Sequence, residues 1–341
     1  MSAAEPGPDG IGVGRGAPPT PMERFKSTYW AAYAAPMAEC ERRLAGITGE
    51  PGRTLGESCS LTLEAGGKRL RPLLVFAAAR RGTKIGEEHH TAAVAVELVH
   101  MATLVHDDIL DGAELRRGRP TLVAKYGSRV GAAAGDYLFS SAFGILVAAG
   151  SPRAVSILTR TSLDLSLGEL VQMEQEGDCD LTGAAYDERC RLKTSGLFSA
   201  ACKLGALLSG CSVQTMTAME EFGRRLGLAF QIADDILDFS GDAAKVGKRA
   251  GADLRDGTVT LPLVMALKRD GSIRDLLGGD PGDGEVDEIC RRVRESGALE
   301  EARREARRHV ALANEALAVA AGELDTGPLA LIAEMAADRR V

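Results

Sequence analysis

Proline is distributed very unevenly along this chain of 341 residues. No proline occurs in residues 73–119, 121–151 or 153–261. An interior proline removes a helical hydrogen bond and clashes with the preceding turn, so these long proline-free runs permit long helices. The runs are also rich in Ala, Leu, Glu, Arg and Met, which favour helix. No convincing alternating strand or Asn-Gly hairpin interrupts them, so the sequence predicts an all-α protein.

Apolar residues recur at helical spacing in segments that glycine-rich breaks separate. The expected helices cover about residues 23–48, 54–65, 71–82, 87–111, 121–148, 153–176, 185–210, 216–239 and 260–270, with more after 285. The Gly- and Asp-rich stretch 272–285 is expected to be a surface loop. Residues 1–21 hold five prolines and five glycines and read as a disordered leader, which leaves 22–341 as a single helical-bundle domain.

The composition is that of an ordinary globular protein, with 45% hydrophobic and 26% charged residues. A net charge of −7 disfavours general binding to nucleic acid or to an anionic membrane. The seven cysteines form no C-x-x-C pair, which favours reduced thiols in a cytoplasmic protein. We see no apolar core of a signal peptide and no run of about 18 apolar residues, so we expect no stable membrane insertion.

The sequence Asp-Asp-Ile-Leu-Asp occurs twice, at 107–111 and at 234–238, each time at the end of a long apolar helical segment. Its first and last aspartates are four residues apart and share a helix face, where they repel each other. They also lie near the negative end of the helix dipole, so each motif costs stability by itself. A hard cation such as Mg²⁺ reverses that cost. A solvated acidic helix end explains one copy, but two copies in the same context favour metal binding by Asp107, Asp108, Asp111, Asp234, Asp235 and Asp238.

Two basic clusters accompany the acidic motifs, at residues 66–72 (Gly-Gly-Lys-Arg-Leu-Arg-Pro) and at 116–121 (Arg-Arg-Gly-Arg-Pro-Thr). Arginine matches phosphate oxygens with two parallel hydrogen bonds, and lysine provides a point charge. Either cluster alone is more often a solvated surface patch. Together with carboxylates and a metal, they describe a diphosphate site. His100 lies about two turns before the first motif on the same helix face, where it can contact a phosphate.

These residues resemble the trans-isoprenyl diphosphate synthase family, the polyprenyl synthetases. The resemblance runs in order from about Lys68 to Pro262. Besides the motifs above it includes Gly135-Asp136, Gly168-Glu169 with Gln172, Lys193-Thr194, Phe230-Gln231, Gly247-Lys248, Gly251, Asp253-Leu254 and Thr260-Leu261-Pro262. The family implies a helical bundle around a deep central cavity, usually a homodimer, and about two or three Mg²⁺ ions, with Mn²⁺ as the alternative. It implies condensation of isopentenyl diphosphate with an allylic diphosphate by metal-assisted ionisation.

The resemblance also implies residue roles. Asp107, Asp111 and Asp234 would bind Mg²⁺ directly, and Asp108, Asp235 and Asp238 would act through bridging water. The allylic diphosphate would be held by Arg116, Lys193 and Lys248, and isopentenyl diphosphate by Lys68, Arg71, His100 and Arg117. Thr194 and Gln231 would face the developing carbocation, and Arg339 or Arg340 would close over the site. Thr258 stands where many members have a second lysine, so one diphosphate contact is in doubt unless a metal or Arg255 compensates.

Product length is expected to depend on the wall of the cavity. In the family, an aromatic residue five positions before the first aspartate is associated with short products, and that position here is Ala102, followed by Thr103. Phe139 and Phe143 are the candidates for a deeper floor. We therefore expect a hexaprenyl or longer all-trans product. The alternatives are a farnesyl or geranylgeranyl diphosphate synthase, a non-catalytic subunit of a heteromeric prenyltransferase, and a class I terpene cyclase.

Overall fold

The computed structural model describes residues 19–50, 52–240, 250–278 and 281–337. Its helices are α1 (Pro21–Thr28), α2 (Trp30–Gly49), α3 (Arg53–Glu64), α4 (Leu70–Ala77), α5 (Glu87–Leu110), α6 (Leu122–Tyr126), α7 (Ser128–Ala148), α8 (Pro152–Glu174), α9 (Gly183–Cys190), α10 (Gly196–Leu208), α11 (Val213–Phe239), α13 (Ala252–Arg255), α14 (Leu261–Leu267), α15 (Ile273–Leu277), α16 (Asp283–Glu295), α17 (Ala298–Ala320) and α18 (Gly327–Ala337). A π-helical turn, η1 (Arg191–Ser195), joins α9 to α10. The all-α prediction is confirmed.

The two helices that carry the acidic motifs are long and mostly buried. In α5, Glu87 and Glu88 occupy the first turn, where they favour the positive end of the helix dipole. The following Ala, Val and Leu residues are buried on all sides, which explains why the helix is apolar throughout rather than amphipathic. In α11, the Ser212 hydroxyl accepts a hydrogen bond from the Thr215 N–H and caps the helix start. Helix α5 ends at Leu110, inside the first Asp-Asp-Ile-Leu-Asp motif, and α11 ends at Phe239, one residue after the second.

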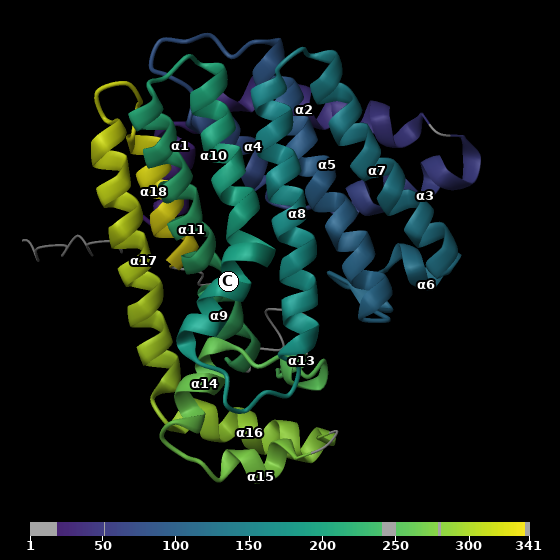
Figure 1. Ribbon diagram of the computed structural model, residues 1–341, viewed down its shortest axis with the longest axis vertical. Helices are drawn as coiled ribbons and strands as arrows, with labels where there is room; N and C mark the ends of the chain where they lie inside the picture. Colours follow the sequence, from purple (N-terminus) through teal and green to yellow (C-terminus); the bar gives the residue numbers. More distant parts are fainter. Residues whose placement is uncertain (1–18, 51, 241–249, 279–280, 338–341) are drawn as a thin grey trace, which may run out of the picture.

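The long helices run roughly side by side, with α8, α10, α11 and α17 along the long axis (Figure 1). Helix α10 packs against α4, α5, α8 and α11, and α11 packs against α17. A large hydrophobic cluster fills the part of the bundle built from α2, α4, α5, α7 and α10. A second cluster lies under α14–α16 at the other end, and α11 contributes residues to both. That the chain forms one domain stays a prediction.

Several predicted boundaries hold and others change. The glycine-rich breaks expected between the helices lie at residues 66–67, 82, 112 and 177. Each contains a glycine with positive φ, which is common where a helix ends or a chain turns. Residue 241 lies outside the described residues. The segment 23–48 divides into α1 and α2 at Tyr29, and 121–148 divides into α6 and α7 at Gly127.

The prediction of a surface loop at 272–285 is wrong in part. The segment contains helix α15 and the start of α16. Ile273 is fully buried in the second hydrophobic cluster, and Leu276 and Leu277 pack against that cluster. Burial of these three side chains outweighs the low helix propensity of the surrounding glycines and aspartates.

A two-residue antiparallel hairpin, which the sequence did not predict, follows α5. Strand β1 (Leu115–Arg116) pairs with β2 (Arg119–Pro120), with Leu115 opposite Pro120 and Arg116 opposite Arg119. The two central residues, Arg117 and Gly118, both have positive φ, as in a type I′ turn. The hairpin therefore fixes the directions in which the arginines of the second basic cluster leave the backbone.

Helix α7 is unusually apolar for its length. By length and composition it is apolar enough to cross a membrane, although only a third of its most apolar window is buried within the protein. The sequence showed no continuous apolar run because Asp136, Ser140 and Ser141 interrupt it. A helix of this composition is also found in the cores of globular bundles, and α7 packs along α5.

Candidate active site

The first acidic motif occupies the last turn of α5 and presents its three aspartates differently. Asp107 is partly buried and Asp111 is exposed. Asp108 is buried, and its carboxylate accepts a 2.8 Å hydrogen bond from Arg116 Nε of the hairpin. Arg116, predicted to bind the allylic diphosphate, is therefore held beside the motif by an ion pair.

The second motif ends α11 and shows the same division. Asp234 is exposed, whereas Asp235 is 1% exposed. Asp238 accepts hydrogen bonds from the backbone N–H groups of Ala252 (3.0 Å) and Asp253 (3.2 Å), and so holds the start of α13. The first aspartates, Asp107 partly buried and Asp234 exposed, are more accessible than the buried second aspartates and are better placed to meet a ligand.

The π-helical turn η1 connects the two motifs. Lys193 Nζ lies 2.5 Å from Glu169 Oε2 of α8 and 4.0 Å from Asp107 Oδ1 of α5. The next residue, Thr194, donates a 2.8 Å hydrogen bond from its hydroxyl to Gln231 Oε1 of α11. Adjacent residues of one turn thus contact the neighbourhoods of both acidic motifs, and π-turns occur frequently at functional sites.

Electrostatics at the first motif favour a cation. The pKa of Asp107 is raised to about 7, chiefly by burial; nearby Glu169 and Asp111 also raise it, while Lys193 and Arg116 lower it. Burial also raises the pKa of Asp111, again opposed by Lys193. Holding these carboxyl groups ionised therefore costs free energy, which a bound cation would offset.

The residues that would hold a metal fit a hard divalent ion. In the parts of the chain that the structure describes, no group of three or more His, Cys, Asp or Glu side chains is arranged to hold an ion unaided. Mg²⁺ accepts such a partial set, because it keeps several waters and takes further oxygens from substrate phosphates. Asp107, Asp111 and Asp234 offer carboxylate oxygens from two helices, and this oxygen-only set suits Mg²⁺ or Mn²⁺.

The predicted isopentenyl diphosphate residues lie around a second centre. His100 is partly buried, and burial together with the positive charges of Arg71, Arg117, Arg116 and Arg69 holds its pKa well below the usual range. Arg71 also lies over the Phe198 ring at 4.6 Å, and Arg117 contacts the Gly66 carbonyl of the loop that carries Lys68.

Sequence reasoning missed the residues that support this loop. Arg69, at the start of α4, has φ 44 and donates to Glu41 (2.6 Å) and to the buried Glu97 of α5 (3.1 Å). Its third contact, 2.9 Å to the Leu63 carbonyl, ties the loop to α3. Glu169 was also missed as a contributor to the site, although it stands in the Gly168-Glu169 pair that the resemblance includes. No spacing rule would have found these contacts, because each one joins different helices.

Some predicted residues cannot be placed in the site. Lys248, Arg339 and Arg340 lie outside the described residues. Arg255 donates to the Ala250 carbonyl (2.8 Å) and to Asp283 of α16 (3.3 Å), so its guanidinium is engaged with that helix. Thr258 donates its backbone N–H to the Asp253 carbonyl (2.8 Å).

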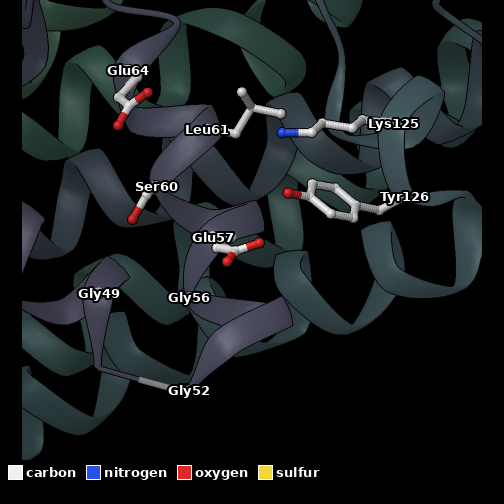
Figure 2. Close-up of a pocket in the computed structure, with 9 residues that line it drawn as sticks. All are labelled: Gly49, Gly52, Gly56, Glu57, Ser60, Leu61, Glu64, Lys125 and Tyr126. Carbon is white, nitrogen blue, oxygen red and sulfur yellow. The ribbon is translucent and has the colours of Figure 1, made fainter.

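A hollow of about 470 Å³ lies away from these residues, between α3 and α6 (Figure 2). Its lining includes Glu57, Ser60, Glu64, Lys125 and Tyr126. None of the predicted site residues lines it, so it is a separate surface feature.

Comparison with known proteins agrees with this geometry. The family model described as polyprenyl synthetase matches residues 53–293. The chain belongs to the polyprenyl synthetase family. It is therefore a prenyltransferase of the all-α isoprenoid synthase type.

Individual members are similar over most of the chain. Heptaprenyl diphosphate synthase component 2 of Geobacillus stearothermophilus is 45% identical over 213 residues, which cover 62% of this chain and 67% of that protein. Geranylgeranyl diphosphate synthase of Methanosarcina mazei is 38% identical over 245 residues, 70% of this chain and 75% of that protein. The structure of a polyprenyl synthase from Caulobacter crescentus, complexed with calcium and isoprenyl diphosphate, superimposes with a TM-score of 0.86 at 34% identity, covering 91% of this chain and 97% of that one.

The raised pKa of Asp107 predicts a stability difference in the metal-free protein. Its carboxyl releases a proton near pH 3.8 when unfolded but only near pH 7 when folded, so stability should fall as pH rises between these values. Asp107→Asn should remove this loss and raise the free energy of unfolding at pH 8 by about 1–4 kcal/mol. The difference from wild type should shrink toward pH 4.

Urea unfolding at pH 5 and pH 8 in the presence of a chelator measures this effect. Asp275→Asn, at an exposed position on α15, is the matched control and should leave the pH dependence unchanged. If Asp107→Asn also leaves it unchanged, burial of the carboxyl group is not the cause of the predicted loss.

Proposed function

We propose that this prenyltransferase condenses isopentenyl diphosphate with an allylic diphosphate to give an all-trans polyprenyl diphosphate and diphosphate. The observation that carries the proposal is the η1 turn. It places Lys193 beside the first acidic motif and Thr194 in contact with Gln231, which lies three residues before the second motif on α11. One substrate bound there would meet carboxylates from two helices, a fixed cation and neutral oxygen groups at the same time.

Binding of the allylic diphosphate follows from the charges. Bound Mg²⁺, held by Asp107, Asp111 and Asp234, would neutralise the charge that develops on the leaving diphosphate. Arg116, fixed by Asp108, and Lys193, fixed by Glu169, add positive groups at set positions. Such preorganised charges are often the largest contribution to catalysis, because they need no rearrangement when the bond breaks.

The reaction then needs no nucleophile from the protein. The bond between the allylic carbon and the diphosphate oxygen breaks, and the electron pair leaves with diphosphate. The double bond of isopentenyl diphosphate attacks the allylic cation and forms the new carbon–carbon bond. A proton is then lost to give the new double bond. Thr194 and Gln231 provide oxygen lone pairs near the cation, whose charge they would stabilise.

The second substrate would bind at the basic centre around His100. Arg71 and Arg117 converge on this histidine, and Lys68 lies on the adjacent loop. Burial keeps His100 neutral, so it can donate one hydrogen bond to a phosphate oxygen without carrying charge. A terpene cyclase takes no isopentenyl diphosphate and has no use for this centre. A non-catalytic subunit would be expected to lose acidic or basic groups, whereas both motifs are complete here.

The metal and substrate assignment predicts large losses of turnover. Asp107→Ala and Asp234→Ala should each lower kcat by about 100-fold or more, because each removes a carboxylate that holds the metal. The assay is incorporation of labelled isopentenyl diphosphate with several allylic primers at saturating Mg²⁺.

Asp275→Ala, at an exposed carboxylate on α15, is the control and should retain wild-type turnover. Near-wild-type rates in both active-site variants would refute the metal assignment. If the wild type is active only after a second protein is added, the result would favour the heteromeric alternative. The Geobacillus relative is named as a component of its synthase, which is the reason to include this test.

The packing of α5 on α7 places the proposed floor of the product cavity. A Cβ added at Gly131 would lie 3.1 Å from Ile109, and one at Gly135 would overlap the His106 ring, so the two helices run antiparallel in close contact. Counting from these contacts puts Phe139 at about the level of Ala102, roughly 7.5 Å below Asp107 along α5. Phe143 lies one turn deeper, and its ring centroid is 5.4 Å from that of Phe139.

We therefore propose a hexaprenyl or longer product. Ala102 is buried and adds little bulk to the wall at the first turn below the metal site, and Thr103 turns its hydroxyl back to the His100 carbonyl (2.8 Å). Neither residue carries an aromatic ring that would close the product cavity at this level. Tyr137 of α7 donates a hydrogen bond to the Ile47 carbonyl of α2. Phe139 and Phe143 lie on the opposite face of α7, so their rings face away from α2 and toward α8.

The floor assignment predicts a change in product length. Ala102→Phe should shorten the product, because a ring there blocks the path one to two turns below Asp107, while the first condensation proceeds. Phe139→Ala should leave the length unchanged or increase it. Chromatography of the dephosphorylated products measures both. A wild-type product that stops at farnesyl or geranylgeranyl diphosphate would contradict the proposed product length and show that the cavity already closes at the level of Phe139 and Phe143.

A homodimer is the second part of the proposal. Helix α8 exposes a stripe of large apolar side chains with helical spacing, formed by Leu163, Leu167, Leu170 and Met173, each at least half exposed. Val147 of the neighbouring α7 is also exposed. An apolar stripe of this kind is typical of a helix that packs on another helix, and a second copy of the chain would cover it.

Introducing a charge into this stripe should dissociate the dimer. Leu167→Glu should convert a dimer to a monomer in light scattering at micromolar concentration, because a carboxylate would be buried at the interface without a partner. Val213→Glu, at an exposed apolar residue on α11, is the control and should stay dimeric. A monomeric wild type would exclude this surface as a self-association site.

A further inference from the structure

A series of hydrogen bonds leads from the buried Tyr186 side chain to Gln231 and Thr194 of the proposed site. Tyr186 of α9 donates its hydroxyl to Asp235 Oδ2 at 2.6 Å, and both side chains are 1% exposed. Gln231 Nε2 donates to Asp235 Oδ1 at 2.8 Å. Thr194 of η1 then donates to Gln231 Oε1 at 2.8 Å. Residues from three elements are thus joined in one series.

The direction of each hydrogen bond follows from the groups present. An ionised carboxylate can only accept, so Asp235 requires a donor on each oxygen. The Gln231 amide meets this need with its nitrogen, which turns its oxygen toward Thr194. The Thr194 hydroxyl has one proton, which it gives to that oxygen. Its remaining lone pairs are left to face other groups.

The backbone around this series leaves little room to move. A Cβ added at Gly227 would overlap Ser195 Cα, so α11 contacts η1 backbone to backbone one turn before Gln231. Arg189, on α9 beside Tyr186, donates to the Val259 carbonyl at 2.6 Å and to Gln175 at 3.1 Å. Its guanidinium lies 5.5 Å from the Tyr186 ring centroid. Tyr186 is therefore held on the side away from the site.

We propose that Tyr186 is a positioning residue that fixes the orientation of the Gln231 amide through Asp235. The consequence is that Gln231 and Thr194 present oxygen lone pairs, rather than an amide N–H, toward the developing allylic cation. This inference rests on the proposed function. It also gives Asp235 a role different from that of Asp234, although the two are adjacent in an identical motif.

The electrostatic reason is the sign of the dipole. An amide oxygen and a hydroxyl oxygen stabilise nearby positive charge, whereas an amide N–H directed at the cation would destabilise it. Without the Tyr186 hydroxyl, one oxygen of a fully buried carboxylate loses its donor, and the Gln231 amide loses the fixed partner that sets its orientation. The expected defect is therefore in the ionisation step and not in substrate binding.

Tyr186→Phe is the direct test, because it keeps the ring and removes only the hydroxyl. We expect the single-turnover rate of the first condensation to fall about 10- to 100-fold, as is usual when a residue supporting an active-site group is changed. The KM values for both substrates should stay within about twofold of wild type, because neither diphosphate site is touched. Tyr137→Phe is the matched control. It removes a 3.1 Å hydrogen bond to the Ile47 carbonyl of α2, which is not part of the series, and should leave the rate unchanged.

A double-mutant cycle separates positioning from a general structural effect. In a Gln231→Ala background, Tyr186→Phe should change the rate by less than about twofold, because the group that Tyr186 orients is already absent. An undiminished loss in that background, or a wild-type rate for Tyr186→Phe alone, would overturn the inference.

A readout without activity keeps this test distinct from that of the proposed function. In urea unfolding, Tyr186→Phe and Gln231→Ala should shift the midpoint by less together than the sum of their separate shifts, because they share one network. Additive shifts would contradict the coupling whatever reaction the wild type performs. A wild type that fails to condense the substrates but shows coupled shifts would refute the proposed function and leave the hydrogen-bond series established.

Discussion

Repulsion between carboxylates held at the ends of two buried helices is the constraint on which the rest of this site depends. The first motif places Asp107 and Asp111 on one helix face, and the fold adds Glu169 from α8. Lys193 lies between Glu169 and Asp107, and its positive charge offsets part of the repulsion among these carboxyl groups. One fixed cation for three carboxyl groups leaves a local excess of negative charge, which suits a site completed by divalent metal and a cationic transition state.

Identical sequence gives unlike chemistry at the two motifs. In each copy the first aspartate is accessible and the second is buried, but the buried ones have different partners. Asp108 holds the guanidinium of Arg116, whereas Asp235 accepts from Tyr186 and Gln231. The first copy therefore orients a guanidinium group, and the second orients neutral oxygen groups. This division would suit the allylic substrate of the proposed reaction, whose diphosphate is negative and whose allylic carbon becomes positive as the bond breaks.

Much of the fold and the positions of the acidic motifs could be predicted because both depend on local pattern. The apolar segment 87–111 became α5 with its end displaced by one residue, since its propensities, its buried side chains and the glycine that follows all agree. The segment 272–285 was misjudged, because its helix depends on the burial of Ile273 against distant residues. Lys68, Arg71 and Arg117 stand in charge clusters that the sequence shows, but the contacts of Arg69 with Glu41 and Glu97, which support the first cluster, were not predicted, since they join separate helices.

The sequence by itself determined the all-α class, the two acidic helix ends and the family, because helix propensity, apolar period and motif order are properties of neighbouring residues. Only the tertiary structure decided which aspartates are accessible, that Lys193 and Thr194 reach different motifs, and that Tyr186 lies behind Asp235. These relations arise from the packing of α8, α9, α10 and α11 around η1, and of α5 against α8 and α10. Distances between such helices are set by side-chain packing across the bundle, which no local pattern encodes.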